Sequence, residues 1–217
     1  MAFTNSPLAT VKVLSPNHSG RRNHKIDTIT IHCVVGQLTA KRIGELFLPK
    51  ERKVSANYGI GYDGEIGLYV EEKNRSWCSS SASNDHRAIT IEVASDTKEP
   101  YAITDKAYES LIKLVTDICK RNEIKELKWK ADKSLVGQVD KQNMTVHRWF
   151  ANKSCPGTYL YNKHSEIAKE VNKRLEPKTT YRVQVGAFGS KDNAEKMLAK
   201  VKKAGFTDAF IKVESKS

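Results

Sequence analysis

Two short segments with the same alternation of apolar and polar residues constrain the fold of this chain most. In TITIHCV (28–34) and AITIEVA (88–94) every second residue is apolar. Side chains of a strand point alternately to opposite faces, so both segments are predicted to be sheet strands with an apolar face on the core. His32 and Glu92 stand at the same place on the two polar faces. If the strands are neighbours, both side chains project into one site.

The rest of the first 175 residues alternates between strand and helix signals. Asp63-Gly64 lies between strand-like residues and predicts a hairpin turn. Thr104 is a suitable N-cap for one of the amphipathic segments. Helices are expected at about 39–47, 104–121 and 159–175. Strands interspersed with long helices predict an α/β domain with a central mixed β-sheet flanked by helices.

The composition changes near the end of this region and predicts a second, small module. EPKTT has the polar, proline-containing composition of a linker. It is followed by a strand-like segment at 181–188, an amphipathic helix and a second strand-like segment at 207–214. We therefore expect a first domain at 1–176, a linker at 177–180 and a βαβ unit at 181–217.

Charge and cysteine content narrow the function classes without choosing one. The formal net charge of +12 suits a polyanionic partner, either nucleic acid or the anionic polymers of a bacterial wall. The excess is spread along the chain and no nucleic-acid motif is recognised, so a diffuse solvated surface is favoured. The four cysteines form no CxxC pair and are expected to be thiols or metal ligands rather than disulfides.

The segment TVHRWFANKSCPG (145–157) is the densest chemical signal. His147 and Cys155 are eight residues apart, a spacing that suits a loop returning on itself. With His32 as a third ligand, they match the usual catalytic zinc site of three protein ligands and a water. The alternatives are ordinary: a surface histidine and a small buried cysteine. Spacing alone leaves the metal and the ordinary interpretations about equal.

Three pieces in order, ITIHCVV, AITIEVAS and HRWFANKSCPG, closely resemble the zinc N-acetylmuramoyl-L-alanine amidases of phages and bacteria, and this resemblance covers about residues 25–175. It implies a zinc amidase domain with one Zn²⁺ in a surface groove, held by His32, His147 and Cys155. It also implies that Glu92 transfers protons and that Lys153 stabilises the oxyanion. Without the metal motif, Glu92 and Lys153 would be ordinary surface residues.

The resemblance also implies substrate contacts beside the metal. Asn57 stands where relatives often carry a histidine beside the hairpin. Trp77 and Asn84 fall in a segment that borders the groove in this family, although packing explains Trp77 equally well. The tyrosine that some relatives use for proton transfer falls at Ala56 here, which moves that role to Glu92. Many relatives carry a histidine where this chain has Cys78, so Cys78 is expected to make no such polar contact.

The second module, from YRVQVGAF onward, resembles the start of the SPOR module, which binds glycan strands stripped of peptides. Gln184 and Phe188 are its candidate glycan contacts, although Phe188 is equally suited to a core. SPOR modules comprise two βαβ halves, and this sequence holds one, which would leave a thin core and an exposed sheet edge. Either the module continues beyond the given sequence or it self-associates with a second copy.

The leading hypothesis is therefore a hydrolase that cuts peptidoglycan between N-acetylmuramic acid and the L-alanine of the stem peptide, causing wall lysis. A recognition protein that binds peptidoglycan without cutting it is the main alternative. A basic nucleic-acid-binding protein ranks well below both. No signal peptide or transmembrane segment is recognised. We therefore expect synthesis in the cytoplasm and release to the wall through a holin or by mother-cell lysis.

Overall fold

The computed structural model describes residues 3–177 and 182–214. The chain falls into two compact units, Met1–Pro177 and Lys178–Ser217. Each is described by itself. Of the linker predicted at 177–180, residues 178–180 lie outside the described part of the chain. No helix in the described residues is both long and apolar enough to cross a membrane.

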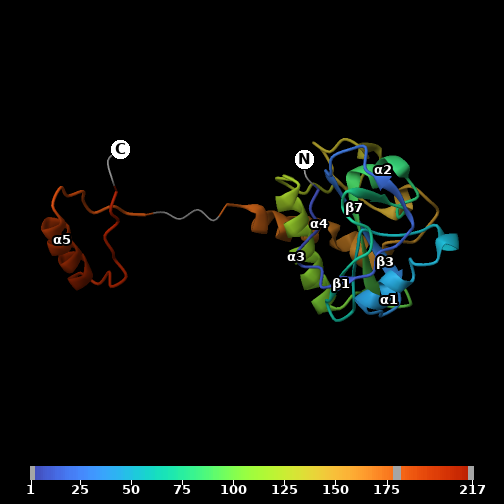
Figure 1. The fold of residues 1–217 in the computed structure, drawn as a ribbon, viewed down its shortest axis with the longest axis horizontal. Helices are drawn as coiled ribbons and strands as arrows, with labels where there is room; N and C mark the ends of the chain where they lie inside the picture. The colour runs from blue at the N-terminus through green and yellow to red at the C-terminus, as the bar shows by residue number, and fades with distance from the viewer. Residues whose placement is uncertain (1–2, 178–181, 215–217) are drawn as a thin grey trace. The chain divides into compact units, whose positions relative to one another are not determined.

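The first unit is built on a six-stranded sheet with the strand order β1-β5-β4-β7-β3-β8. Three of these strands, β1, β3 and β7, are labelled in Figure 1. The β4–β5 pair is antiparallel and the other neighbours are parallel, so the sheet is mixed, as predicted. Its strands are β1 Val11–Lys12, β3 Thr28–Val35, β4 Tyr58–Ile60, β5 Ile66–Leu68, β7 Ala88–Ser95 and β8 Met144–Thr145. A separate antiparallel pair is formed by β2 His18–Arg21 and β6 Asn74–Ser76.

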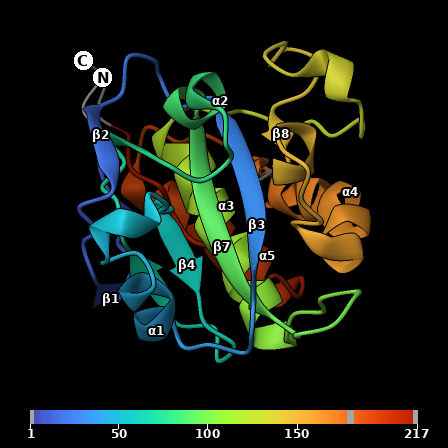
Figure 2. The same cartoon turned by 90° about the vertical axis from the view of Figure 1, so that its right-hand side faces the viewer.

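The two alternating segments form the long central strands β3 and β7, which lie side by side in Figure 2. Their register pairs all eight residues, from Thr28 with Ala88 to Val35 with Ser95, and it places His32 directly opposite Glu92. The condition for a shared site is therefore met, since the two strands are neighbours. Both faces of β3 are covered, because Thr30 and His32 on its polar face are as fully buried as the isoleucines on the other.

Helices cover both faces of the sheet. The apolar face of β3 and β7 packs against two long helices, α3 and α4, in the main core. On the opposite face α1 contributes Ile43 to a smaller cluster around Tyr69. The helices of the described residues are α1 Ala40–Glu45, α2 Ala82–Arg87, α3 Asp105–Arg121, α4 Gly157–Leu175 and α5 Lys191–Lys203, with short 3-10 helices η1 Lys50–Arg52, η2 Lys133–Leu135 and η3 His147–Trp149.

Caps and turns recognised in the sequence predicted the positions of several of these elements. Thr104 caps α3, its side chain accepting from the backbone N–H of Ala107. Thr39 caps α1 rather than belonging to it, so this helix is shorter than the predicted 39–47. The predicted hairpin joins β4 to β5, and Gly64 adopts φ +86°, a conformation that glycine reaches without steric cost.

The second unit differs from the predicted βαβ arrangement. The helix α5 is present, but the described residues of 181–188 and 207–214 form no strand, and Tyr181 is outside the described part. Val183 and Val213 remain 90% and 87% exposed, and α5 has no buried residue. A pair of strands with one helix buries too little apolar surface to offset the entropy of ordering. The two strand-like segments of this unit therefore find no apolar surface within its described residues to pack against.

A buried ion pair joins α3 to the loop after β5. The Glu72 side chain is fully buried and accepts from Arg121 Nη2 at 2.6 Å and from the Tyr58 hydroxyl at 2.7 Å. Arg121 also bonds to Asp117 and to the carbonyl oxygen of Thr4. Because a buried carboxylate without its cation is strongly disfavoured, this pair fastens the C-terminal end of α3.

We expect Arg121→Met to lower the free energy of unfolding by about 3–5 kcal/mol, because it leaves the buried Glu72 carboxylate without its cationic partner. Lys113→Met is the matched control on the same helix, since Lys113 pairs with Glu109 while both side chains are more than half exposed. That control should cost no more than about 1 kcal/mol. Urea unfolding followed by tryptophan fluorescence measures both, and equal losses would contradict the assignment.

Candidate metal centre

Three of the sequence-predicted residues come together at one edge of the sheet. The candidate ligand atoms of His32, His147 and Cys155 all lie within 4.8 Å of one another. The Cys155 sulfur is 3.4 Å from Nδ1 of His32, and the two imidazole rings meet edge to face with centroids 5.1 Å apart. The residues come from β3, η3 and the turn before α4, so the fold rather than local sequence assembles the group.

The shortness of β8 makes this assembly geometrically feasible. β8 pairs with β3 only at Ile29 and Thr30, so the edge of β3 beyond them has no strand beside it. The chain leaving β8 forms η3, which lies against β3 and carries His147. It then returns to Cys155, whose carbonyl oxygen accepts from the Arg148 backbone N–H at 3.2 Å. The loop that carries His147 and Cys155 thus lies beside β3 where a paired strand would otherwise lie.

Burial keeps the two imidazoles neutral. It lowers the pKa of His32 to about 3, with the nearby His147 and His164 adding to the effect. The pKa of His147 is also lowered, first by burial and then by the charge of Lys153. The neutral imidazole is the form that binds a metal. A hydrogen bond with Cys33 is the first cause, and burial the second, of a raised pKa of the Cys155 thiol. The thiol is therefore protonated without a metal, and metal binding would release its proton.

The donor set fits zinc. Two imidazoles and one thiolate with a fourth position left for water are a common catalytic zinc arrangement. Zinc–ligand bonds of about 2.0–2.3 Å place ligand atoms roughly 3–4 Å apart, so the observed separations need only a small closure. Nδ1 of His32 is the ring nitrogen that faces the Cys155 sulfur, so it is the nitrogen of that ring placed to bind the metal.

Glu92 stands beside this group with one oxygen unpartnered. Its Oε2 atom is buried and has no hydrogen bond among the described residues, and burial raises its pKa to about 7. Oε1 lies 3.8 Å from the Cys78 sulfur. Together with His32, these two residues form a second group of potential metal ligands within 4.8 Å. The Cys78 thiol therefore faces the Glu92 carboxylate, a contact that the sequence did not indicate.

Lys153 lies on the loop between His147 and Cys155 and is exposed. Its backbone N–H donates to the Ala151 carbonyl at 2.9 Å, which tightens the loop. The charge of Lys153 contributes to the lowered pKa of His147. Its role at the site remains a prediction.

Two of the three predicted substrate contacts are interior residues. Asn57 is fully buried and bonds to Arg22, Val70 and Thr90. Asn84 is 4% exposed. Its amide donates to the Thr30 hydroxyl and accepts from that of Thr145, each at 3.0 Å. Both amides are thus hydrogen-bonded to buried neighbours, and contact of either residue with substrate stays a prediction.

The third predicted contact, Trp77, is half-buried, and its indole N–H donates to Ser19 Oγ at 2.6 Å. Trp77 directly precedes Cys78 in the chain. Its contact with substrate stays a prediction. In the second unit Gln184 and Phe188 are both exposed. The Gln184 amide donates to the Gly186 carbonyl at 3.2 Å, and glycan binding by these two residues is likewise still a prediction.

Sequence reasoning missed Ser80 and Asp85. The Ser80 hydroxyl lies 3.0 Å from Nε2 of His147. The Asp85 carboxylate accepts from the backbone N–H groups of Cys78 and Ser79 at 3.1 and 3.2 Å, which shapes the turn that carries Ser80. The run SSSASND contained a signal for the cap of α2 at Ser81, but nothing in it points to His147.

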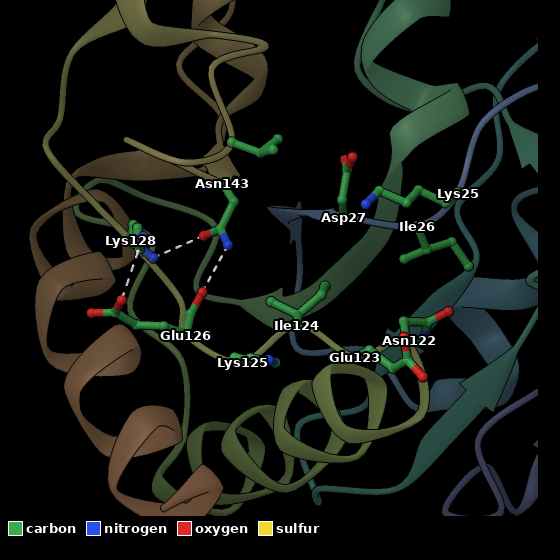
Figure 3. Close-up of a pocket in the computed structure, with 11 residues that line it drawn as sticks. Lys25, Ile26, Asp27, Asn122, Glu123, Ile124, Lys125, Glu126, Lys128 and Asn143 are labelled. Atoms are coloured by element: carbon green, nitrogen blue, oxygen red, sulfur yellow. Dashed lines mark hydrogen bonds and ion pairs between the residues drawn. The ribbon is translucent and has the colours of Figure 1, made fainter.

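An open hollow elsewhere in the first unit is separate from this chemistry. It has a volume of about 310 Å³, and its lining includes Asp27 and Asn143, the residues just before β3 and β8 (Figure 3). Asn143 points into it, but its amide already donates to the Glu126 carbonyl and accepts from the Lys128 backbone N–H, both at 2.8 Å. None of the metal-group residues lines this hollow.

Two parts of the chain match known family models. Residues 22–158 match the family model described as N-acetylmuramoyl-L-alanine amidase, and residues 177–217 match the SPOR domain. The first match covers more than half of the chain. No curated protein matches this sequence.

Solved structures show the same fold. The chain is similar to LysCS, an endolysin N-acetylmuramoyl-L-alanine amidase from Clostridium intestinale URNW, with 21% identity and a TM-score of 0.54 over 75% of this chain and 94% of that one. A selenomethionine derivative of AmpD has 20% identity and a TM-score of 0.55 over 77% and 99%. Drosophila peptidoglycan recognition protein SA has 14% identity and a TM-score of 0.54 over 72% and 91%.

We expect Asn84→Ala to lower the free energy of unfolding by about 1–3 kcal/mol, because it leaves the buried hydroxyls of Thr30 and Thr145 without their shared partner. Ser83→Ala, one residue away on the exposed side of α2, is the control and should change it by less than about 0.5 kcal/mol. Urea unfolding provides the comparison. A loss at Asn84 no larger than at Ser83 would show that the network carries no stability.

Proposed function

The chain belongs to the N-acetylmuramoyl-L-alanine amidase family, and on that premise we propose that it hydrolyses the amide bond between N-acetylmuramic acid and L-alanine in peptidoglycan, using one Zn²⁺ held by His32, His147 and Cys155. The observation that carries this proposal is the convergence of these three side chains within 4.8 Å, next to a buried carboxylate. Cutting this bond separates stem peptides from glycan strands and leads to lysis of the wall.

The roles of the surrounding residues follow from their placement. A bound Zn²⁺ would lower the pKa of a water molecule towards about 7 and polarise the amide carbonyl. The unpartnered Oε2 of Glu92 is free to accept a proton from the attacking water and to return it to the leaving amine. Lys153, the exposed cation of the loop, would stabilise the negative charge that develops on the carbonyl oxygen.

The second unit supplies a partner site in this proposal. Its match to the SPOR domain supports binding of glycan strands that have lost their peptides, with Gln184 and Phe188 as contacts. Each cut by the first unit would then create binding sites for the second, which raises the effective concentration of enzyme on the wall. We further propose release to the wall by a holin or by mother-cell lysis, and self-association through the exposed apolar residues of this unit.

A peptidoglycan-binding protein without activity is the alternative, because the fold also occurs in Drosophila peptidoglycan recognition protein SA. The complete set of three candidate ligands, Glu92 and Lys153 favours catalysis over binding alone. Release of new amino termini from purified walls distinguishes the two functions, since a recognition protein would bind the walls and release none.

Replacing Cys155 with serine tests the metal centre. We expect Cys155→Ser to lose Zn²⁺ affinity by more than the 10–100-fold typical of outer-sphere changes, and to lose turnover with it, because a hydroxyl is a poor substitute for a thiolate ligand. Metal content after gel filtration and release of new amino termini are measured in parallel. Cys119→Ala, a core cysteine outside the metal group, should keep its zinc. Full zinc content in Cys155→Ser would remove Cys155 from the site.

Replacing Glu92 with glutamine separates metal binding from proton transfer. Glu92→Gln should retain Zn²⁺ yet lose about 10²–10⁴-fold in kcat, the usual contribution of a general acid–base group. Glu65→Gln, on the exposed hairpin turn, should leave the rate unchanged. Both are measured by release of new amino termini from purified walls. An unaffected rate in Glu92→Gln would assign proton transfer to another group.

A further inference from the structure

Ser80 makes a contact that the proposed chemistry has not used. Its Oγ atom lies 3.0 Å from Nε2 of His147, within hydrogen-bond distance. Ser80 is the exposed residue of the short segment 77–81 between β6 and α2, far from His147 in the sequence. Two residues from separate parts of the chain therefore meet at the outer side of a candidate metal ligand.

The backbone of Ser80 is unusual. Its φ of +63° lies in the left-handed region, which is disfavoured for any residue with a Cβ atom. Within residues 3–177 and 182–214, the other non-glycine residues with positive φ are Lys53, Tyr101, Glu123 and Ala131. None of those four belongs to the metal group or hydrogen-bonds to it through a side chain. A serine retained in a conformation that suits glycine indicates a use for its hydroxyl.

The surrounding residues hold this turn in place. The buried Asp85 carboxylate accepts from two consecutive backbone N–H groups, those of Cys78 and Ser79. On the other side, the Ser81 hydroxyl accepts from the Asn84 N–H and caps α2. The position of the Ser80 hydroxyl is therefore set by fixed neighbours on both sides.

We propose that Ser80 is a positioning residue for His147, an assignment that rests on the zinc centre proposed above. A hydrogen bond at Nε2 leaves Nδ1 as the nitrogen available to a metal, and it places the ring proton on Nε2, where it is donated to the serine oxygen. Partners of this kind hold the tautomer and the ring orientation of metal-ligating histidines. Ser80 thereby raises zinc affinity without touching the ion.

A serine–histidine pair at this distance also resembles a nucleophile with its general base. That arrangement needs a third group to orient the histidine, and no carboxylate bonds to His147 within the described residues. His147 also stands among two other potential ligands. The positioning role therefore fits the site better, and the experiment below separates the two roles.

The test compares Ser80→Gly and Ser80→Ala with Ser83→Ala, an exposed serine in the first turn of α2 whose hydroxyl bonds to Ser81 instead of His147. Zinc dissociation constants are measured by competition with a chromophoric chelator, and Tm is measured on the metal-free proteins. Both Ser80 variants should bind zinc about 10–100-fold more weakly than the wild type. Ser83→Ala should bind it as the wild type does. Because glycine adopts positive φ freely, Ser80→Gly should keep or raise the metal-free Tm.

Loss of zinc affinity without loss of Tm in Ser80→Gly would support the assignment. Wild-type affinity in both Ser80 variants would overturn it, and so would a metal-free Tm that falls together with affinity, since that marks a purely structural residue. Unchanged affinity with abolished hydrolysis would instead make the hydroxyl a group that acts on substrate. If the wild-type protein itself bound no zinc, the proposed metal centre would fail, an outcome distinct from all of these.

Discussion

The in-register parallel pairing of β3 with β7 is the constraint on which the rest of the structure depends. It forms the centre of the sheet, and both of its faces are covered. The same register places His32 beside Glu92. A slip of one residue would turn His32 towards the apolar core and Ile31 towards the site, because strand side chains alternate. Packing and chemistry therefore require one and the same alignment.

Features that depend on neighbouring residues could be predicted from sequence. The alternation around His32 and Glu92 located both central strands, and Thr104 and Gly64 marked a helix start and a turn. The meeting of His32 with Cys155 was predicted by resemblance to a family, not by geometry. No local pattern indicates that β8 ends early enough to leave room for the loop.

Features that depend on distant contacts could not be predicted. Asn57 and Asn84 look like groove residues in sequence, but their amides are used by partners from other elements. The contact of Ser80 with His147 could be recognised only in the folded structure, because the two residues are distant in the sequence. The second unit shows the converse: the alternation around Val183 is a genuine strand pattern, but without a surface to cover it the described residues there form no sheet.

The early end of β8 has a consequence for how this site can diversify. A strand at the edge of β3 would be tied to its neighbour by a ladder of backbone bonds, so each insertion would shift every later side chain. The loop from His147 to Cys155 contributes side chains instead, and one backbone bond, from Arg148 to Cys155, closes it. The exposed residues 152–154 between these points can be exchanged provided that the two ends keep their reach, whereas Trp149 is buried and stacked on Trp129. The exposed part of the loop beside β3 can therefore vary in sequence more than the central strands β3 and β7.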